Sequence, residues 1–278
     1  MEGWHLFFGY NTNGFAHHRL VDAISILSEL GYRGISLTPD VNHLGLPDPD
    51  DESVAAFREQ LRKHGLACAV ETGSRFLLDS RRKHQPTLVS PTADERDRRL
   101  TFLYRCVALA VALDAGVVSL WSGTATDAAS FDITMERLVE SCKPLVEDAA
   151  NSGIRLAFEP EPGMFIDTMD KFEELHAKVH HPHFGLTLDV GHLVCTGELP
   201  VGDVIRKWKK WLWNVHLDDM RPGVHDHRMF GEGTVDFEDV FAALREINFK
   251  GIASVELSRH SYDAVHVARK AKEFLDRL

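Results

Sequence analysis

Short apolar runs alternate along the chain with longer segments in which apolar residues recur every three or four positions. The short runs are typical of buried strands, and the longer spacing is typical of helices that bury one face. The pattern predicts strands at residues 5–10, 34–38, 66–71, 116–121, 153–159, 184–189, 212–216 and 251–256. It predicts helices at residues 18–30, 51–64, 93–114, 133–150 and 262–278, with others between the later strands.

This alternation of strand and helix indicates an α/β fold with parallel strands. Strands this apolar need cover on both faces, so we predict a single-domain (β/α)8 TIM barrel over residues 1–278. Glycines that precede the strands support the register: Gly31, Gly65, Gly116, Gly153 and Gly251. An open doubly wound sheet is the alternative, but residues 9–14 (Gly-Tyr-Asn-Thr-Asn-Gly) do not form the phosphate-binding turn such a sheet usually carries.

The last four predicted strands each end in a residue that can bind a metal: Glu159, Asp189, His216 and Glu256. The C-terminal ends of barrel strands converge on one pocket, so we expect these side chains to meet there. Any one of these carboxylates alone is as readily explained as a helix cap, and the argument depends on all four residues together. Clustered carboxylates take up protons unless a cation is present, so the set predicts a divalent ion. Oxygen-rich ligation with one imidazole favours Mn²⁺, with Mg²⁺, Co²⁺, Fe²⁺ or Zn²⁺ as alternatives.

Several segments resemble the xylose isomerase-like superfamily: Phe158-Glu159-Pro160, Leu188-Asp189-Val190-Gly191-His192, Val215-His216-Leu217-Asp218-Asp219, Gly231-Glu232-Gly233 with Asp236-Phe237, and Val255-Glu256-Leu257. That superfamily includes ketose 3-epimerases, hydroxypyruvate isomerase, inosose dehydratase and metal-dependent apurinic endonucleases. The resemblance implies that the four strand-end residues are the metal ligands. It also implies that Glu159 and Glu256 are the catalytic acid/base pair, while His192 and Arg228 hold substrate oxygens.

A second set of polar residues is expected in loops beside the same pocket: His43, Glu161, His192, His225, Asp226 and His227. Four of them are candidates for a second metal, as in the endonuclease branch: His192, His225, Asp226 and His227. However, strands three and four end in Glu71-Thr72 and Trp121-Ser122, without the further histidines of that branch. We therefore favour an interpretation in which His225 and His227 hydrogen-bond to the substrate or to a metal ligand. Substrate contacts are also expected from His43, Glu161 and His192, with Trp121 as an apolar wall for a sugar ring.

Taken together, these features imply a divalent-metal-dependent isomerase or epimerase of a sugar or related polyol-derived ketone. One carboxylate would remove a proton next to a carbonyl, and the other would return it, through a metal-stabilised enediolate. A metal-dependent dehydratase acting on a sugar- or inositol-like ketone is the main alternative. An endonuclease-type hydrolase and a non-catalytic sugar binder are further alternatives.

The composition limits which partners and which cellular location are expected. A formal net charge of −11 argues against binding to nucleic acid, which relies on clustered Lys and Arg. The most apolar region is interrupted by Asp114 and Gly116 and is shorter than a membrane span, so no membrane contact is expected. Four dispersed cysteines and the lack of an export signal predict reduced thiols and a cytoplasmic location. The family resemblance implies a homodimer or homotetramer.

One predicted connection, residues 72–92, is too long for a simple turn. Loops of this length inside a domain are often lids or binding loops. The loop also carries local positive charge in an acidic protein, from Arg75, Arg81, Arg82, Lys83 and His84. It is predicted either to cover the pocket or to be a solvated surface loop.

Overall fold

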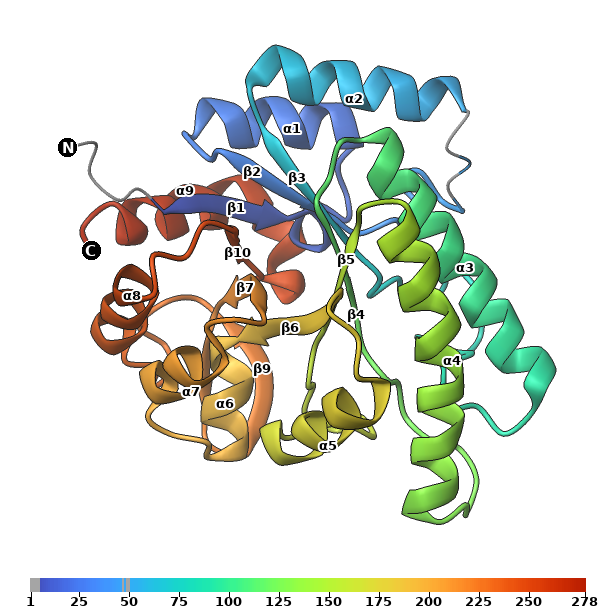
Figure 1. Ribbon diagram of the computed structural model, residues 1–278. Helices are drawn as coiled ribbons and strands as arrows, with labels where there is room; N and C mark the ends of the chain where they lie inside the picture. Colours follow the sequence, from blue (N-terminus) through green and yellow to red (C-terminus); the bar gives the residue numbers. More distant parts are fainter. Residues whose placement is uncertain (1–5, 47, 49–50) are drawn as a thin grey trace.

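Eight parallel strands close into a barrel in the computed structural model, which describes residues 6–46, 48 and 51–278 (Figure 1). They are β1 (Phe7–Asn11), β2 (Gly34–Leu37), β3 (Ala67–Glu71), β4 (Val117–Leu120), β5 (Arg155–Phe158), β6 (Phe184–Asp189), β7 (Leu212–Leu217) and β10 (Ile252–Val255). They follow chain order around the barrel, and β10 pairs with β1 to close it. The predicted (β/α)8 fold is confirmed.

Strand bounds differ from the predicted ones by one or two residues at an end, and β6 covers the predicted range 184–189. Residue 5 of the first predicted strand lies outside the described residues. Glu159 and Glu256 were predicted as the last strand residues but follow β5 and β10. Their backbone N–H groups still donate to the neighbouring strands, at 2.8 Å to the Leu120 carbonyl and 2.9 Å to the Leu217 carbonyl. The barrel therefore holds their backbone in place although they are outside the strands.

Helices surround the barrel and cover the outer face of its strands (Figure 1). The described part of the chain forms α1 (Leu20–Glu29), α2 (Glu52–His64), α3 (Ala93–Ala112), α4 (Phe131–Asn151), α5 (Met169–Val179), α6 (Val190–Thr196), α7 (Val201–Trp208), α8 (Phe237–Glu246) and α9 (Ala264–Leu275). None of these helices is long and apolar enough to cross a membrane. Side-chain caps set several boundaries, because Thr92 and Ser130 accept hydrogen bonds from the first turns of α3 and α4. The predicted helix at 262–278 is shorter, because a 3-10 segment (Ser258–Asp263) forms its beginning.

A small antiparallel hairpin after β7 is absent from the sequence-based prediction. It consists of β8 (Asp219–Arg221) and β9 (Val224–Arg228), joined at Gly223, whose φ of +71° suits a residue without a side chain. Its residues are mostly polar, so no apolar run marks it. Successive side chains of a strand point to opposite faces, so β9 places His225 and His227 on one face and Asp226 and Arg228 on the other. This alternation decides which of these residues reach the pocket.

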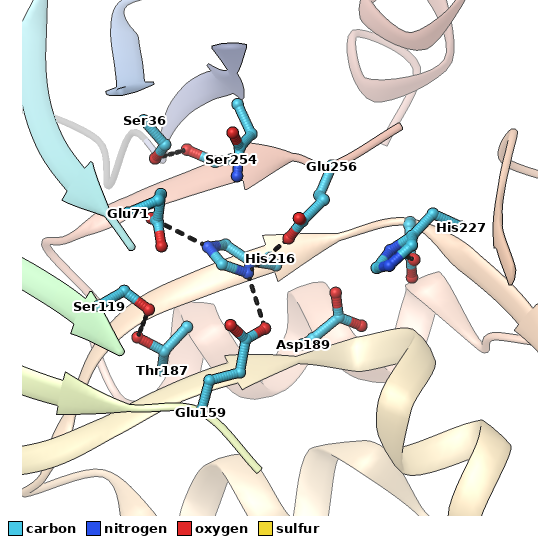
Figure 2. A network of polar contacts seen from close by, with 12 residues as sticks. Ser36, Glu71, Ser119, Glu159, Thr187, Asp189, His216, His227, Ser254 and Glu256 are labelled. Carbon is cyan, nitrogen blue, oxygen red and sulfur yellow. Dashed lines mark hydrogen bonds and ion pairs between the residues drawn. The ribbon is translucent and has the colours of Figure 1, made fainter. Parts of the chain in front are cut away.

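Polar side chains fill the upper part of the barrel interior, below its C-terminal end. Ser36 and Ser254 lie 2.6 Å apart, and the Thr187 hydroxyl donates to Ser119 at 2.8 Å. Asn214 is fully buried among them. Each of these side chains has at least one hydrogen-bond partner in the interior, which limits the cost of burying it, although Asn214 Oδ1 has none among the described residues. This layer supports the acidic residues at the strand ends (Figure 2).

Candidate metal centre and active site

Four adjacent barrel strands bring the predicted ligands together. Glu159 follows β5, Asp189 ends β6, His216 lies in β7 and Glu256 follows β10. One ligand atom from each lies within 4.8 Å of the others. The β6–β7 register places Asp189 directly beside His216. Figure 2 shows the four side chains turned toward one another from their strands.

The His216 ring lies at the centre of this cluster and is 1% exposed. Its Nδ1 is 2.9 Å from Glu159 Oε1 and 2.8 Å from Glu256 Oε2. Its Nε2 is 3.0 Å from Glu71 Oε1, on the other side of the ring (Figure 2). Burial alone would lower the pKa of His216, but Glu159, Glu71 and Glu256 together raise that pKa well above its ordinary value. In the absence of a metal, the imidazolium form is therefore favoured.

The pKa values of the two glutamates beside His216 Nδ1 are shifted in opposite directions. Burial raises the pKa of Glu159, and the attraction of His216 offsets only part of this effect. Burial would also raise the pKa of Glu256, but His216, His227 and a hydrogen bond from Asn13 bring that pKa below its ordinary value. The Asn13 amide donates to Glu256 Oε1 at 2.7 Å. The protonated form is thus favoured for Glu159, and the ionised form is favoured for Glu256.

The donor set fits a divalent metal ion. Asp189 Oδ1 accepts a hydrogen bond from the His192 backbone at 3.0 Å. Its Oδ2 is buried and has no hydrogen-bond partner among the described residues. A buried carboxylate oxygen without a partner is costly unless a cation binds it. Three carboxylates and one imidazole match the preferences of Mn²⁺, Fe²⁺, Co²⁺ and Zn²⁺, so the geometry does not select one ion.

A second cluster consists of His192, His225 and His227, whose ligand atoms also lie within 4.8 Å of one another. His192 Nε2 and His225 Nε2 are 3.1 Å apart, while His192 Nδ1 contacts the Pro160 carbonyl at 3.1 Å. Asp226 does not belong to this cluster, because it lies on the opposite face of β9 and accepts a hydrogen bond from Arg228 at 2.9 Å. The predicted second-metal set of four is thus reduced to the three histidines.

Asp218 is a buried residue whose role the sequence-based prediction missed. Its Oδ2 lies 2.6 Å from His227 Nδ1. Burial would lower the pKa of His227, but Asp218 raises it to about 10, with help from Glu256 and Asp189. The imidazolium form of His227 is therefore favoured beside the acidic cluster. Asp189, Asp218 and His227 also lie close enough together to form a third possible ligand group.

A cavity of about 460 Å³ opens above the cluster. Of the predicted site residues, it is lined by Trp121, Glu159, Glu161, His192, His216, His225, His227 and Glu256. Asp189 lies below it, with a side chain that is 0% exposed. Burial raises the pKa of Glu161 to about 7. Most of the predicted substrate contacts thus share one cavity with the acidic cluster.

Two predicted substrate contacts, Arg228 and His43, are not among the described residues that line this cavity. Arg228 is directed by β9 to the face opposite the histidines and pairs with Asp226. His43 is 1% exposed, and its Nε2 lies 3.1 Å from the His18 carbonyl. The spacing of these residues along the chain gave no information on side-chain direction. Substrate contacts from either residue stay predictions, and the proposed function does not use them.

The loop at residues 72–92 forms one wall of the cavity through Thr72, Gly73, Arg75, Lys83 and His84. Arg81 and Arg82 lie outside it, and Arg82 pairs with Asp79 at 2.8 Å. Leu88 and Val89 are fully buried, so the end of the loop packs into the core. Of the two predictions for this loop, the structure favours the one in which it covers the pocket.

Trp121 forms the apolar part of the same wall. Its ring lies 5.3 Å from the His84 ring in an edge-on arrangement and 4.4 Å from the Arg99 guanidinium. Arg99 is fully buried and donates to the Thr72 carbonyl at 2.7 Å. Burial lowers the pKa of Arg99 to about 10. These contacts hold the indole in place at the edge of the cavity.

Glu71, Asn13 and Arg259 are lining residues that the sequence-based prediction left without a role. Glu71 had the same signal as the chosen ligands, a carboxylate at a strand end. Asn13 and Arg259 lie in polar segments where no residue is distinguished from its neighbours. Their roles depend on contacts between distant parts of the chain.

The fold and the cluster define a (β/α)8 barrel with a candidate metal centre at the C-terminal ends of its strands. Residues 24–278 match the model of the xylose isomerase-like TIM barrel family, and the chain belongs to this family.

An inosose dehydratase of Clostridium botulinum (strain Alaska E43) is 27% identical over 136 residues. The match covers 43% of this chain and 45% of the dehydratase, so the chain spans about half the length of that relative. A D-allulose 3-epimerase from Methylomonas sp. has a solved structure with a TM-score of 0.78 and 19% identity, covering 98% of this chain and 96% of that chain. The structure of an IolI protein with a bound zinc atom has a TM-score of 0.79 and 18% identity, covering 98% and 97%. At this identity the structural likenesses establish the fold alone.

Proposed function

We propose that this protein is a divalent-metal-dependent enzyme that isomerises or epimerises a sugar or a related polyol-derived ketone. The observation that carries the proposal is the placement of two glutamates from separate strands. Glu159 and Glu256 both lie within 2.9 Å of His216 Nδ1, around the position that a metal ligated by this nitrogen would occupy. A non-catalytic binder would not require two acidic groups facing one such position.

The reaction requires removal of a proton from a carbon next to a carbonyl and its return. A divalent ion held by Glu159, Asp189, His216 and Glu256 would polarise the carbonyl and stabilise negative charge on its oxygen. Glu256, whose pKa is lowered, suits the role of the base, and Glu159, whose pKa is raised, suits the acid. Asn13 donates to Glu256 and orients its carboxylate.

Substrate binding is assigned to the rest of the cavity. A volume of about 460 Å³ is sufficient for a monosaccharide. Glu161, His192, His225 and His227 offer hydrogen bonds to hydroxyl groups, and Trp121 offers an apolar face for a sugar ring.

One metal ion is proposed rather than two. The raised pKa of His227 beside Asp218 favours an imidazolium, which donates hydrogen bonds but does not ligate a metal. His192 Nε2 and His225 Nε2 lie 3.1 Å apart, close enough for the two rings to hydrogen-bond to each other. Metal analysis of the loaded protein should give one equivalent per chain. Two equivalents would instead assign the second ion to His192, His225 and His227.

A dehydratase is the second candidate, and the likeness to inosose dehydratase over 136 residues favours it. The same base would remove the same type of proton, and loss of hydroxide from the adjacent carbon would follow. Epimerisation and dehydration differ in product, because only dehydration yields water and an unsaturated or diketone product.

The test uses protein stripped by a chelator and reloaded with Mn²⁺. Ketopentoses, ketohexoses and inososes are incubated with it in D₂O and followed by NMR. Deuterium entering a carbon-bound position of an intact or epimerised sugar supports the leading proposal, and a dehydrated product supports the second. Metal-loaded protein that neither exchanges nor dehydrates any of these compounds contradicts both.

A further inference from the structure

Glu71 is a buried carboxylate that the proposed reaction does not use. It is the last residue of β3, and it is 4% exposed. Three strands separate β3 from β7 around the barrel, so the contact between Glu71 and His216 crosses the barrel interior. Glu71 Oε1 lies 3.0 Å from His216 Nε2. Figure 2 shows it on the side of the ring away from Glu159 and Glu256.

The chemistry of this contact determines which nitrogen of His216 carries a proton. An ionised carboxylate only accepts hydrogen bonds, so Nε2 must be the donor in this pair. Asn214 lies beside it and donates its amide to the same Glu71 oxygen at 2.9 Å. Once Nδ1 gives up its proton to ligate a metal, the remaining hydrogen of the neutral ring lies on Nε2, where Glu71 accepts it. The lone pair of Nδ1 faces Glu159 and Glu256, which belong to the same ligand cluster.

We propose that Glu71 is a positioning residue that fixes His216 in the tautomer and orientation in which Nδ1 binds the metal. This inference rests on the metal site of the proposed function, but not on the reaction or the substrate. Glu71 itself is outside the four-residue ligand cluster, because its carboxylate contacts the far side of the ring. A carboxylate behind a ligating imidazole orients the ring and increases its basicity, and loss of such a partner typically weakens metal binding by about 10- to 100-fold.

Two substitutions separate charge from hydrogen bonding. Glu71→Ala removes the acceptor, and we expect the affinity for Mn²⁺ to fall by about 10- to 100-fold. Glu71→Gln keeps an oxygen that can accept from Nε2 but removes the charge, so we expect a smaller loss. Ser36→Ala is the matched control, because it removes a different buried interior hydrogen bond, that to Ser254, and leaves His216 untouched. Affinity is measured by competition with a chromogenic chelator, and thermal unfolding of the metal-free proteins records any general loss of stability.

A second readout reports the tautomer directly. Protein with ¹⁵N-labelled histidine is loaded with ¹¹³Cd²⁺, and the nitrogen that couples to the metal is identified by NMR. Coupling to Nδ1 is expected in the unsubstituted protein and in Glu71→Gln. Glu71→Ala should lose this single pattern through Nε2 coordination or a mixture of both forms.

The possible results separate failure of the positioning role from failure of the proposed function. Full affinity with Nδ1 coordination in Glu71→Ala would overturn the positioning role while leaving the metal site intact. An equal loss in Ser36→Ala would also overturn it, because the effect would then be general to the barrel interior. If the unsubstituted protein binds no divalent ion, the proposed function itself fails. If Glu71→Ala does not fold, Glu71→Met takes its place, because it fills the same space without an acceptor for Nε2: full affinity with Nδ1 coordination in that variant would overturn the positioning role.

Discussion

The two halves of the cavity are built in different ways. The half formed by β5, β6, β7 and β10 carries its acidic residues and His216 within the strands or immediately after them. The half formed by β1 to β4 contributes Glu71 at the end of β3 and, beyond it, mainly loop residues, including Asn13, Arg75 and Lys83. The four-residue ligand cluster of the first half is acidic and mostly buried, whereas the loop residues Arg75 and Lys83 of the second half are basic, and they are half-buried and exposed, respectively.

Different contacts hold these halves in place. In the acidic half, strand pairing sets positions, as in the pairing of Asp189 with His216. In the loop half, side chains do so, since Arg75 donates to the Asn13 carbonyl at 3.0 Å and to Asp40 at 3.2 Å. Groups on strands are held more precisely than groups on loops, and loops tolerate change more readily. We therefore expect the acidic half to carry out the chemistry and the loops of the other half to add to substrate selection. These loops would act beside the substrate contacts proposed for Glu161, His192, His225 and His227.

The largest loss of activity is expected from a substitution in the acidic half. Glu256→Gln removes the proposed base while keeping its shape, and turnover should fall by about 100- to 10,000-fold. The control is Glu246→Gln, which alters an exposed glutamate paired with Arg206 on the outer surface. Steady-state kinetics with the substrate found in the D₂O screen provide the measurement. Turnover within a few fold of the unsubstituted enzyme would remove Glu256 from the reaction.

The pH dependence of metal binding tests the same half. The raised pKa of His216 means that the metal-free site holds a proton that must leave when Nδ1 binds a metal. Affinity for Mn²⁺ should therefore decrease as the pH falls, by about tenfold per pH unit for each proton released. Calorimetry in buffers of different ionisation enthalpy counts the protons. An affinity independent of pH, with no proton release, would contradict the protonated state of the metal-free cluster.

A smaller effect is expected at the boundary between the halves. Trp121→Phe shortens the apolar wall, and KM should rise by about three- to tenfold with little change in kcat, since an aromatic contact contributes about 1 kcal/mol. Trp211→Phe is the control, because that indole packs against His176 and does not line the cavity. A fall in kcat with KM unchanged would place Trp121 in the chemical step instead.

The smallest effect is expected at the rim of the loop half. Lys83 is exposed, and no ion pair within the described part of the chain involves it. Lys83→Ala should change KM for a neutral sugar by less than about threefold, because exposed charges interact weakly. Kinetics at low and high salt provide the measurement. A much larger, salt-sensitive increase in KM would indicate a substrate with an anionic group and would give the loop half a direct role in binding it.

The amino-acid sequence by itself determined the barrel and the four candidate ligands. Apolar runs report burial locally, and a strand end is visible as the point where a run stops. Glu159, Asp189, His216 and Glu256 could therefore be selected without knowledge of their contacts. The β6 range 184–189 was predicted to the residue: turn residues precede the strand, and α6 begins at Val190 directly after it.

Only the tertiary structure decided which other side chains lie beside the four candidate ligands. Glu71 and His216 are 145 positions apart, and their contact depends on the curvature of the closed barrel. The direction of Arg228 and Asp226 depends on the β8–β9 hairpin, which no apolar pattern reveals. A one-residue change in strand register reverses the face to which a side chain points. Local composition cannot specify that register, and so the pairing of strands, rather than the spacing of residues, placed His225 and His227 at the cavity and Arg228 on the opposite face of β9.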